Sequence, residues 1–205
     1  MSINSTTSSR SELSEEESFR ARFYGLLAHL LSAPPSPVTL ATLKDLEGDG
    51  SHIGRTLQSL AASARNATPE TVEEEYNALF IGMGTGGELY PYLSRYLTGF
   101  LHEKPLARLR SDMAALGIAA SGDVGEPEDH MAALCEIMHG LIAGSFGDPT
   151  PIEVQHKFFD AHLAPWAITF FEDLENAKSS DFYRSVGTIG RLFMAVEAEA
   201  FEMAA

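Results

Sequence analysis

Two pairs of glutamate and histidine have a spacing that suits metal binding. Glu136-x-x-His139 and Glu153-x-x-His156 each place a carboxylate and an imidazole three residues apart, which puts both groups on one face of a helix. Two pairs of this kind belong to the ligand set of dinuclear iron or manganese sites in helical bundles. A helical dinuclear-metal carboxylate enzyme is therefore one hypothesis for this chain.

The helices expected around these pairs direct both carboxylates away from the core. With a turn of about 100° per residue, Glu136 lies opposite the apolar stripe of its own helix. Glu153 has a simpler role, because Thr150 and Pro151 precede it in the pattern of a capping box. The metal enzyme is therefore the weaker hypothesis. The apolar stripe consists of Met131, Leu134, Cys135, Met138, Leu141 and Ile142.

Other catalytic patterns are weaker still. The glycine-rich stretch "GMGTGGE" follows no predicted strand and leads into no Gly-Lys-Ser/Thr, so it does not indicate a phosphate-binding loop. Cys135 is the only cysteine, which excludes an internal disulfide, and its place on the apolar stripe predicts an inert packing residue. His162 lies among aromatic residues and is expected to be a hydrogen-bonded core histidine. We expect no catalytic residue and no cofactor.

Composition limits the classes of partner. The 29 acidic and 14 basic residues give a net charge of −15, which argues against nucleic-acid binding and favours a basic partner. The N-terminus lacks the basic start and apolar core of a secretory signal, and no apolar run is long enough for a transmembrane helix. We therefore expect a cytoplasmic protein without a membrane span.

Helical periodicity dominates the chain, and runs of alternating β-branched residues are nearly absent. Residues 1–12 are rich in Ser and Thr and predict a disordered tail, whereas 13–205 predict one all-α domain of bundle type with a candidate hinge at 117–126. Capping residues predict helix starts at Ser14, Ser36 and Thr68. Helices are expected over about 14–31, 36–46, 53–60, 68–80, from 91, and over 105–116, 127–143, 151–177 and 181–203.

Three segments together resemble the TorD/DmsD/NarJ family of maturation chaperones for molybdenum redox enzymes. They are "EYNALFIGMGTGGELYPYLSRY", with an aromatic-x-x-Leu-Phe pattern before a glycine-rich turn, then "EPEDH", and then "QHKFFDAHLAPWAITFFEDL". Their order and spacing match the family over about residues 70–177. The resemblance implies an all-helical, TorD-like fold and a role in binding rather than catalysis.

Such chaperones hold the apo catalytic subunit of a molybdopterin-dependent oxidoreductase in the cytoplasm, often by its twin-arginine leader, until the cofactor is inserted. The resemblance implies the same partner here, with no cofactor of the chaperone's own, and a monomer or a domain-swapped dimer. It leaves open which molybdoenzyme is the client. A helical adaptor unrelated to redox enzymes remains a third hypothesis.

A leader with two arginines and an apolar stretch requires carboxylates beside an apolar groove in its receptor. Acidic residues near Pro127 could serve the guanidinium groups, or could simply favour the start of a helix. Leu79 and Phe80 could line a groove or belong to the core. The expected peptide-binding residues are Tyr76, Leu79, Phe80, Pro91, Tyr92, Tyr96, Glu126, Pro127, Asp129 and His130, together with Glu128.

A second set of residues is expected to be structural. Pro165 interrupts the predicted 151–177 helix and should kink it or divide it in two, and Trp166 should anchor that bend by burying its ring. The expected structural residues are Gln155, Phe158, His162, Pro165 and Trp166.

Overall fold

The computed structural model describes residues 13–82, 86–119 and 126–204. The predicted tail at 1–12 lies outside these ranges, as does most of the predicted hinge at 117–126. Within them every regular element is helical, and the only strand-like feature is an isolated antiparallel bridge between Tyr92 and His130. The helices are α1 (Glu15–Ser32), α2 (Pro37–Lys44), α3 (His52–Asn66), α4 (Pro69–Tyr76), the π-helix η1 (Asn77–Ile81), α5 (Leu93–Thr98), α6 (Lys104–Ala115), α7 (Met131–Ala143), α8 (Ile152–His162), α9 (Ala167–Asn176) and α10 (Phe182–Ala204).

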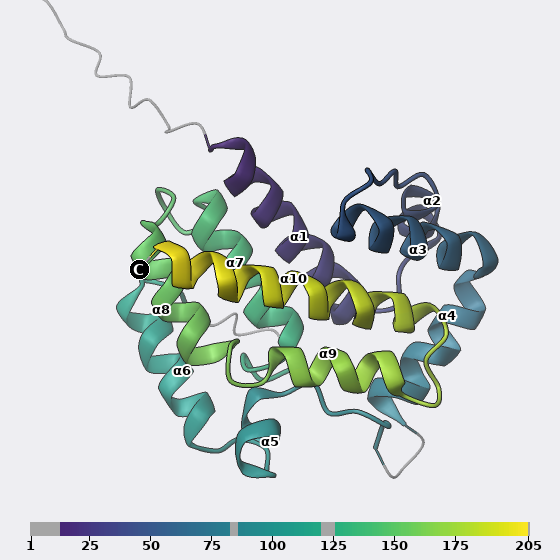
Figure 1. Cartoon of the computed structure of the whole chain (residues 1–205). Helices are drawn as coiled ribbons and strands as arrows, with labels where there is room; N and C mark the ends of the chain where they lie inside the picture. Colours follow the sequence, from purple (N-terminus) through teal and green to yellow (C-terminus); the bar gives the residue numbers. More distant parts are fainter. Residues whose placement is uncertain (1–12, 83–85, 120–125, 205) are drawn as a thin grey trace, which may run out of the picture.

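The all-α prediction is confirmed, and the helices pack as a bundle. α1 packs mainly against α7, while α10 crosses the molecule and packs against α9 and α3 (Figure 1). Glycines allow the close approach of α9 and α10, because a Cβ on Gly190 would lie 2.3 Å from the Phe171 ring and one on Gly187 would lie 2.5 Å from the Glu175 nitrogen. No helix in the described ranges is both long and apolar enough to cross a membrane.

Local capping fixes the starts of the first helices as the sequence predicts. Ser14 and Glu17 form a reciprocal capping box at α1, and the Ser36 hydroxyl accepts the Thr39 N–H at α2. Thr68 caps α4, which begins with Pro69. Beyond Tyr76 the backbone widens into η1, so the predicted 68–80 helix has an α part and a π part.

Two predictions about helix starts are wrong. The Thr150 hydroxyl donates to the Leu141 carbonyl at 3.1 Å instead of capping α8, so no capping box forms with Glu153. The helix predicted to start at Pro127 begins only at Met131, because His130 serves as its N-cap. The acidic residues of "EPEDH" therefore lie before α7 and not in its first turn.

The predicted division at Pro165 is confirmed. α8 ends at His162 and α9 begins at Ala167, with the exposed Pro165 in the connecting turn. The buried Trp166 donates its indole N–H to the His162 carbonyl at 2.8 Å, which joins the two helices across the turn.

A buried polar network joins α1, α8 and α10. The Arg20 guanidinium donates to both carboxylate oxygens of Glu197, at 2.7 and 2.9 Å, and to Oε1 of Gln155 at 3.0 Å. The Tyr24 hydroxyl also donates to Glu197, at 3.0 Å. Because each buried charge is paired and hydrogen-bonded, the network fixes the relative placement of the three helices.

Candidate peptide-binding groove

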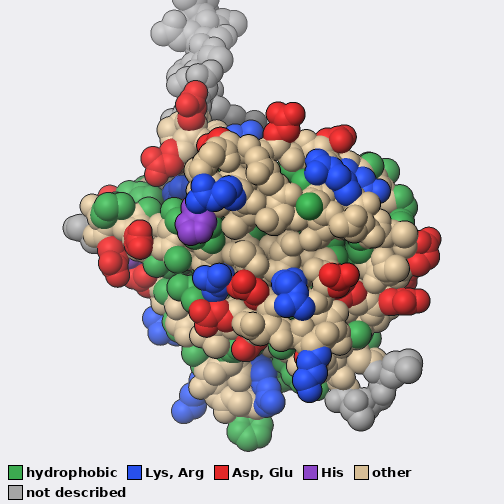
Figure 2. Space-filling view, turned by 45° about the vertical axis from the view of Figure 1, so that its right-hand side comes forward, with side chains coloured by type: hydrophobic (Ala, Val, Ile, Leu, Met, Phe, Trp, Pro, Cys, Tyr) green, Lys and Arg blue, Asp and Glu red, His purple; other side chains and the backbone are tan. Residues whose placement is uncertain are grey.

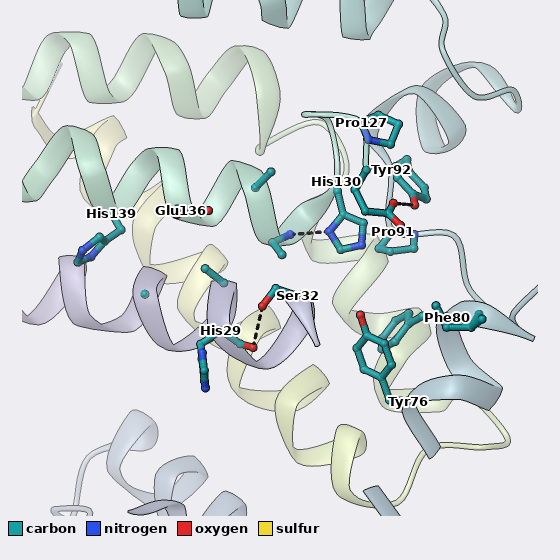
Figure 3. Close-up of a pocket in the computed structure, with 16 residues that line it drawn as sticks. His29, Ser32, Tyr76, Phe80, Pro91, Tyr92, Pro127, His130, Glu136 and His139 are labelled. Carbon is teal, nitrogen blue, oxygen red and sulfur yellow. Dashed lines mark hydrogen bonds between the residues drawn. The ribbon is translucent and has the colours of Figure 1, made fainter. Parts of the chain in front are cut away.

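A groove of about 460 Å³ runs between α1 and α7 and ends at the junction of α4 and η1. Figure 3 shows His29 and Ser32 on one wall, Glu136 and His139 on the other, and aromatic side chains at one end. Several of the predicted peptide-binding residues line it, namely Tyr76, Phe80, Pro91, Tyr92, Glu126, Pro127 and His130. The other lining residues are Gly25, Ala28, His29, Ser32, Ile81, Ala132, Ala133, Glu136 and His139.

Backbone pairing positions one end of the groove. The Met131 N–H donates to the Pro91 carbonyl at 2.8 Å, and the Leu93 N–H donates to the Asp129 carbonyl at 2.9 Å. These two bonds hold the segment before α5 against the segment before α7. The motifs "YPYLS" and "EPEDH", separated along the chain, therefore meet at the groove.

Asp129 supports this junction and does not face the groove. Its side chain is almost fully buried, and Oδ2 accepts the Ser94 N–H at 2.9 Å in the first turn of α5. A carboxylate at this position satisfies a backbone donor that the helix cannot satisfy itself. In this structure Asp129 is thus placed to hold α5 in position, while Leu79, also fully buried, belongs to the core.

His130 is a buried member of the groove wall. Its Nδ1 accepts the Ala132 N–H at 3.1 Å, so in the neutral ring Nε2 carries the hydrogen. Burial lowers the pKa of His130, although the charges of Glu126 and Asp129 act in the opposite direction. The ring is therefore neutral near pH 7, where it packs edge-on against Tyr92 at 5.1 Å between centroids.

The acidic residues of "EPEDH" have separate surroundings. The exposed Glu126 accepts a hydrogen bond from the Tyr92 hydroxyl at the groove rim. Burial and this bond raise the pKa of Tyr92. Glu128 instead forms an ion pair with Arg110, at 2.8 Å, and does not line the groove. Glu126 is therefore the acid of this motif that a ligand in the groove can reach.

Aromatic rings form the end of the groove opposite Glu136 (Figure 3). The rings of Tyr76 and Phe80 pack edge-on at 5.0 Å, and the Tyr76 hydroxyl donates to the Leu31 carbonyl at 3.2 Å. Tyr96 lies elsewhere. Its ring is 5.0 Å from that of Trp166, and its hydroxyl donates to Asp173 at 2.8 Å.

The sequence did not single out α1 as a wall of the site. The groove side of α1 carries Gly25, Ala28, His29 and Ser32 at three- and four-residue spacing. Three of these four residues are small, and this pattern was the available signal. Gly25 also admits His139, whose Nδ1 would lie 3.3 Å from a Cβ at that position.

Glu136 and His139 belong to the groove rather than to a metal centre. The Nδ1–H of His139 donates to the Ala21 carbonyl at 2.8 Å, while His156 pairs with Asp160 at 3.1 Å and stacks on Phe201. Among the residues that the structure describes, no group of three or more His, Cys, Asp or Glu side chains is arranged to hold a metal ion. The two Glu-x-x-His pairs do not converge.

The groove lining is acidic. It contains the carboxylates of Glu126 and Glu136 and no Lys or Arg among its described residues. Glu136 is exposed and makes no hydrogen bond or ion pair within the described part of the chain. A cationic ligand would therefore find at least one carboxylate without a competing partner.

The expected structural residues surround a different part of the bundle. Gln155, Phe158 and Trp166 are buried, and the buried His162 lies with Nε2 2.9 Å from Oδ2 of Asp112. Burial lowers the pKa of His162, against the opposing effect of Asp112. None of these residues lines the groove.

Comparison with known proteins agrees with the family resemblance seen in the sequence. The family model described as nitrate reductase delta subunit matches residues 47–172. The chaperone protein TorD of Vibrio atlanticus is 28% identical over 167 residues, covering 74% of this chain and 76% of that protein. TorD of Aliivibrio fischeri is 28% identical over 206 residues, covering 85% of this chain and 91% of that protein.

A solved structure supports the fold. A chain assigned as a redox enzyme maturation protein from Archaeoglobus fulgidus superposes with a TM-score of 0.59 at 20% identity, covering 86% of this chain and 94% of that one. At this level of identity the likeness speaks for the arrangement of helices alone.

Proposed function

Because this chain belongs to the nitrate reductase delta subunit family of TorD- and NarJ-like maturation chaperones, we propose that its groove binds the twin-arginine leader of a molybdoenzyme precursor. Family membership makes the chain a molybdoenzyme maturation chaperone, which is a binding role rather than a catalytic one. In our proposal it acts in the cytoplasm and retains the apo catalytic subunit until the cofactor is inserted.

The observation that carries the proposal is that exposed carboxylates and apolar surface occur in one groove. Glu126 and Glu136 are both exposed, and no lysine or arginine lines the groove among the described residues. A guanidinium group forms strong hydrogen bonds with a carboxylate and stacks on aromatic rings such as those of Phe80 and Tyr92, which are partly exposed in the groove. The groove thus offers both kinds of contact that an arginine-containing peptide needs.

The apolar part of a leader has a matching surface between these acids. Ala28, Ala132 and Ala133 are among the lining residues. From His130 to His139 the helical rise amounts to ~14 Å, a length covered by about four residues of extended peptide. In our proposal the arginine pair lies near Glu126 and the aromatic end, and the following residues extend along α7 toward Glu136.

Titration with a synthetic twin-arginine leader peptide tests this assignment. Glu126→Gln should weaken binding most, because the arginine pair lies near Glu126, and Glu136→Gln should weaken it less, through loss of longer-range attraction. Rising salt should weaken binding further because the attraction is between opposite charges. The matched control is Glu153→Gln, which removes the same charge from an exposed position on α8 outside the groove. Unchanged affinity in both groove variants, or an equal loss in the control, would remove the groove from leader binding.

A further inference from the structure

The turn between α5 and α6 carries exposed hydrophobic side chains at its tip. Leu97, Phe100 and Leu101 are 46%, 70% and 40% exposed. The turn has a defined shape, since Gly99 ends α5 in the left-handed region with φ 81° and the Thr98 hydroxyl accepts the Phe100 N–H at 3.2 Å. Apolar side chains that share one short turn form a patch, in contrast to single exposed residues spread over a surface.

Basic residues flank this tip along the chain. Residues 95–110 contain Arg95, Lys104, Arg108 and Arg110 and a single acidic residue, Glu103, in a chain whose net charge is −15. Arg110 is paired with Glu128 at 2.8 Å, so Arg95, Lys104 and Arg108 supply the basic character of the turn. Lys104 forms no hydrogen bond or ion pair within the described residues, and Arg108 is only 3.8 Å from its partner Asp112 with its side chain 70% exposed. Figure 2 shows the lower end of the molecule, where α5 lies in Figure 1, as a hydrophobic projection flanked by Lys and Arg.

We propose that the α5–α6 turn docks on an anionic lipid bilayer. The apolar tip would enter the interface between headgroups and acyl chains, while the basic side chains around it meet the lipid phosphates. The shape favours lipid over protein, because the tip is convex and a bilayer accommodates a projecting side chain without a preformed pocket. The acidity of the rest of the chain would keep other faces away from the same membrane and so orient the molecule.

The position of this turn relates it to the groove. Tyr92 lines the groove and directly precedes α5, whose six residues span ~9 Å along the helix axis. A chaperone docked by this turn would therefore hold its groove close to the membrane surface. The docking itself does not depend on which ligand occupies the groove.

Co-sedimentation of the full chain with lipid vesicles tests the proposal. We expect binding to vesicles that contain phosphatidylglycerol, weak binding to pure phosphatidylcholine, and loss of binding at high salt. Phe100→Ser should lower the affinity for anionic vesicles by about tenfold, the effect of withdrawing one large apolar side chain from the interface. The control is Val38→Ser on α2, which removes a residue that is 76% exposed and lies outside the patch.

A charge-reversal variant tests the basic part separately. Lys104→Glu combined with Arg108→Glu should abolish the preference for anionic vesicles, while circular dichroism and leader-peptide affinity stay unchanged. Equal binding to neutral and anionic vesicles, or a Phe100→Ser variant that binds as Val38→Ser does, would overturn the proposal. It would also be overturned if these variants left vesicle binding unchanged and instead weakened capture of an acidic precursor protein, which would make the turn a protein-docking surface.

Discussion

Replacement of Asp129 by alanine should lower stability first and peptide affinity only as a consequence. The Asp129 carboxylate is buried and accepts the Ser94 N–H at 2.9 Å at the start of α5. Loss of a helix cap costs about 1 kcal/mol, and a buried donor left without its charged acceptor raises the total to about 2 kcal/mol. For a chain of this size that corresponds to a fall in Tm of about 4–8 °C.

Glu126 in the same motif should behave in the opposite way. It is exposed, and Glu126→Gln keeps an oxygen that can accept from the Tyr92 hydroxyl, so stability should change by less than about 0.5 kcal/mol. The affinity for a twin-arginine peptide should fall about fivefold, the size expected for one partly exposed charge pair. Asp129→Ala should weaken binding only to the extent that the junction between α5 and α7 loosens.

Urea denaturation and peptide titration of the same preparations distinguish the two roles. Titrations are run well below the Tm of each variant, so that loss of folded protein does not appear as loss of affinity. Asp129→Asn is the matched control, because its amide oxygen can still accept the Ser94 N–H and should retain most of the stability. If Asp129→Ala were fully stable and yet failed to bind peptide, the carboxylate would contact the ligand and our interpretation of its burial would be wrong.

Two further predictions concern the core. Arg20→Met leaves the Glu197 carboxylate buried without its partner and should lower the free energy of unfolding, measured by urea denaturation, by about 3–5 kcal/mol. The double variant with Glu197→Leu should recover much of this loss. Equal instability of the single and double variants would contradict this prediction. Burial lowers the pKa of His130 and His162 below the ordinary histidine value of 6.5. The unfolded chain therefore binds more protons than the folded chain near that pH, and the free energy of unfolding should fall as pH drops below 6.5. The combined His130→Asn, His162→Gln variant should show a flatter pH dependence, and an unchanged slope would assign the effect to other groups.

Sequence reasoning predicted helix starts well where the capping chemistry is local. Ser14 and Thr68 cap the helices that their own residues begin, so the neighbouring sequence contains all the information required. Thr150 shows the limit, because its hydroxyl bonds to Leu141 on the preceding helix instead. At the start of α10, three consecutive backbone N–H groups, those of Asp181, Phe182 and Tyr183, donate to the Glu75 carboxylate at 2.7 to 3.0 Å. Glu75 belongs to α4, so no pattern near Phe182 could have indicated this partner.

Only part of the groove was predictable from the sequence, because local motifs reveal some of its residues and tertiary contacts bring in the others. The aromatic and acidic motifs carry recognisable residue types, so Tyr92, Glu126 and His130 could be named before their positions were known. The small residues of α1 form the facing wall only because α1 packs on α7, which is a tertiary contact between segments about 100 residues apart. Periodicity did place Glu136 on the side of α7 away from the apolar stripe, and that exposure leaves its carboxylate available in the groove.

Charge is distributed unevenly over this molecule, and the unevenness connects its two proposed surfaces. A net charge of −15 would accelerate the approach of any basic peptide, yet it cannot by itself distinguish a leader from another basic segment. In our proposal, discrimination comes from the fixed positions of Glu126 and Glu136 relative to the aromatic end of the groove. The basic α5–α6 turn would be neutralised by salt or anionic lipid without altering those positions. Leader affinity and membrane docking should therefore respond independently to substitutions in the two regions, even though Tyr92 links them along the chain.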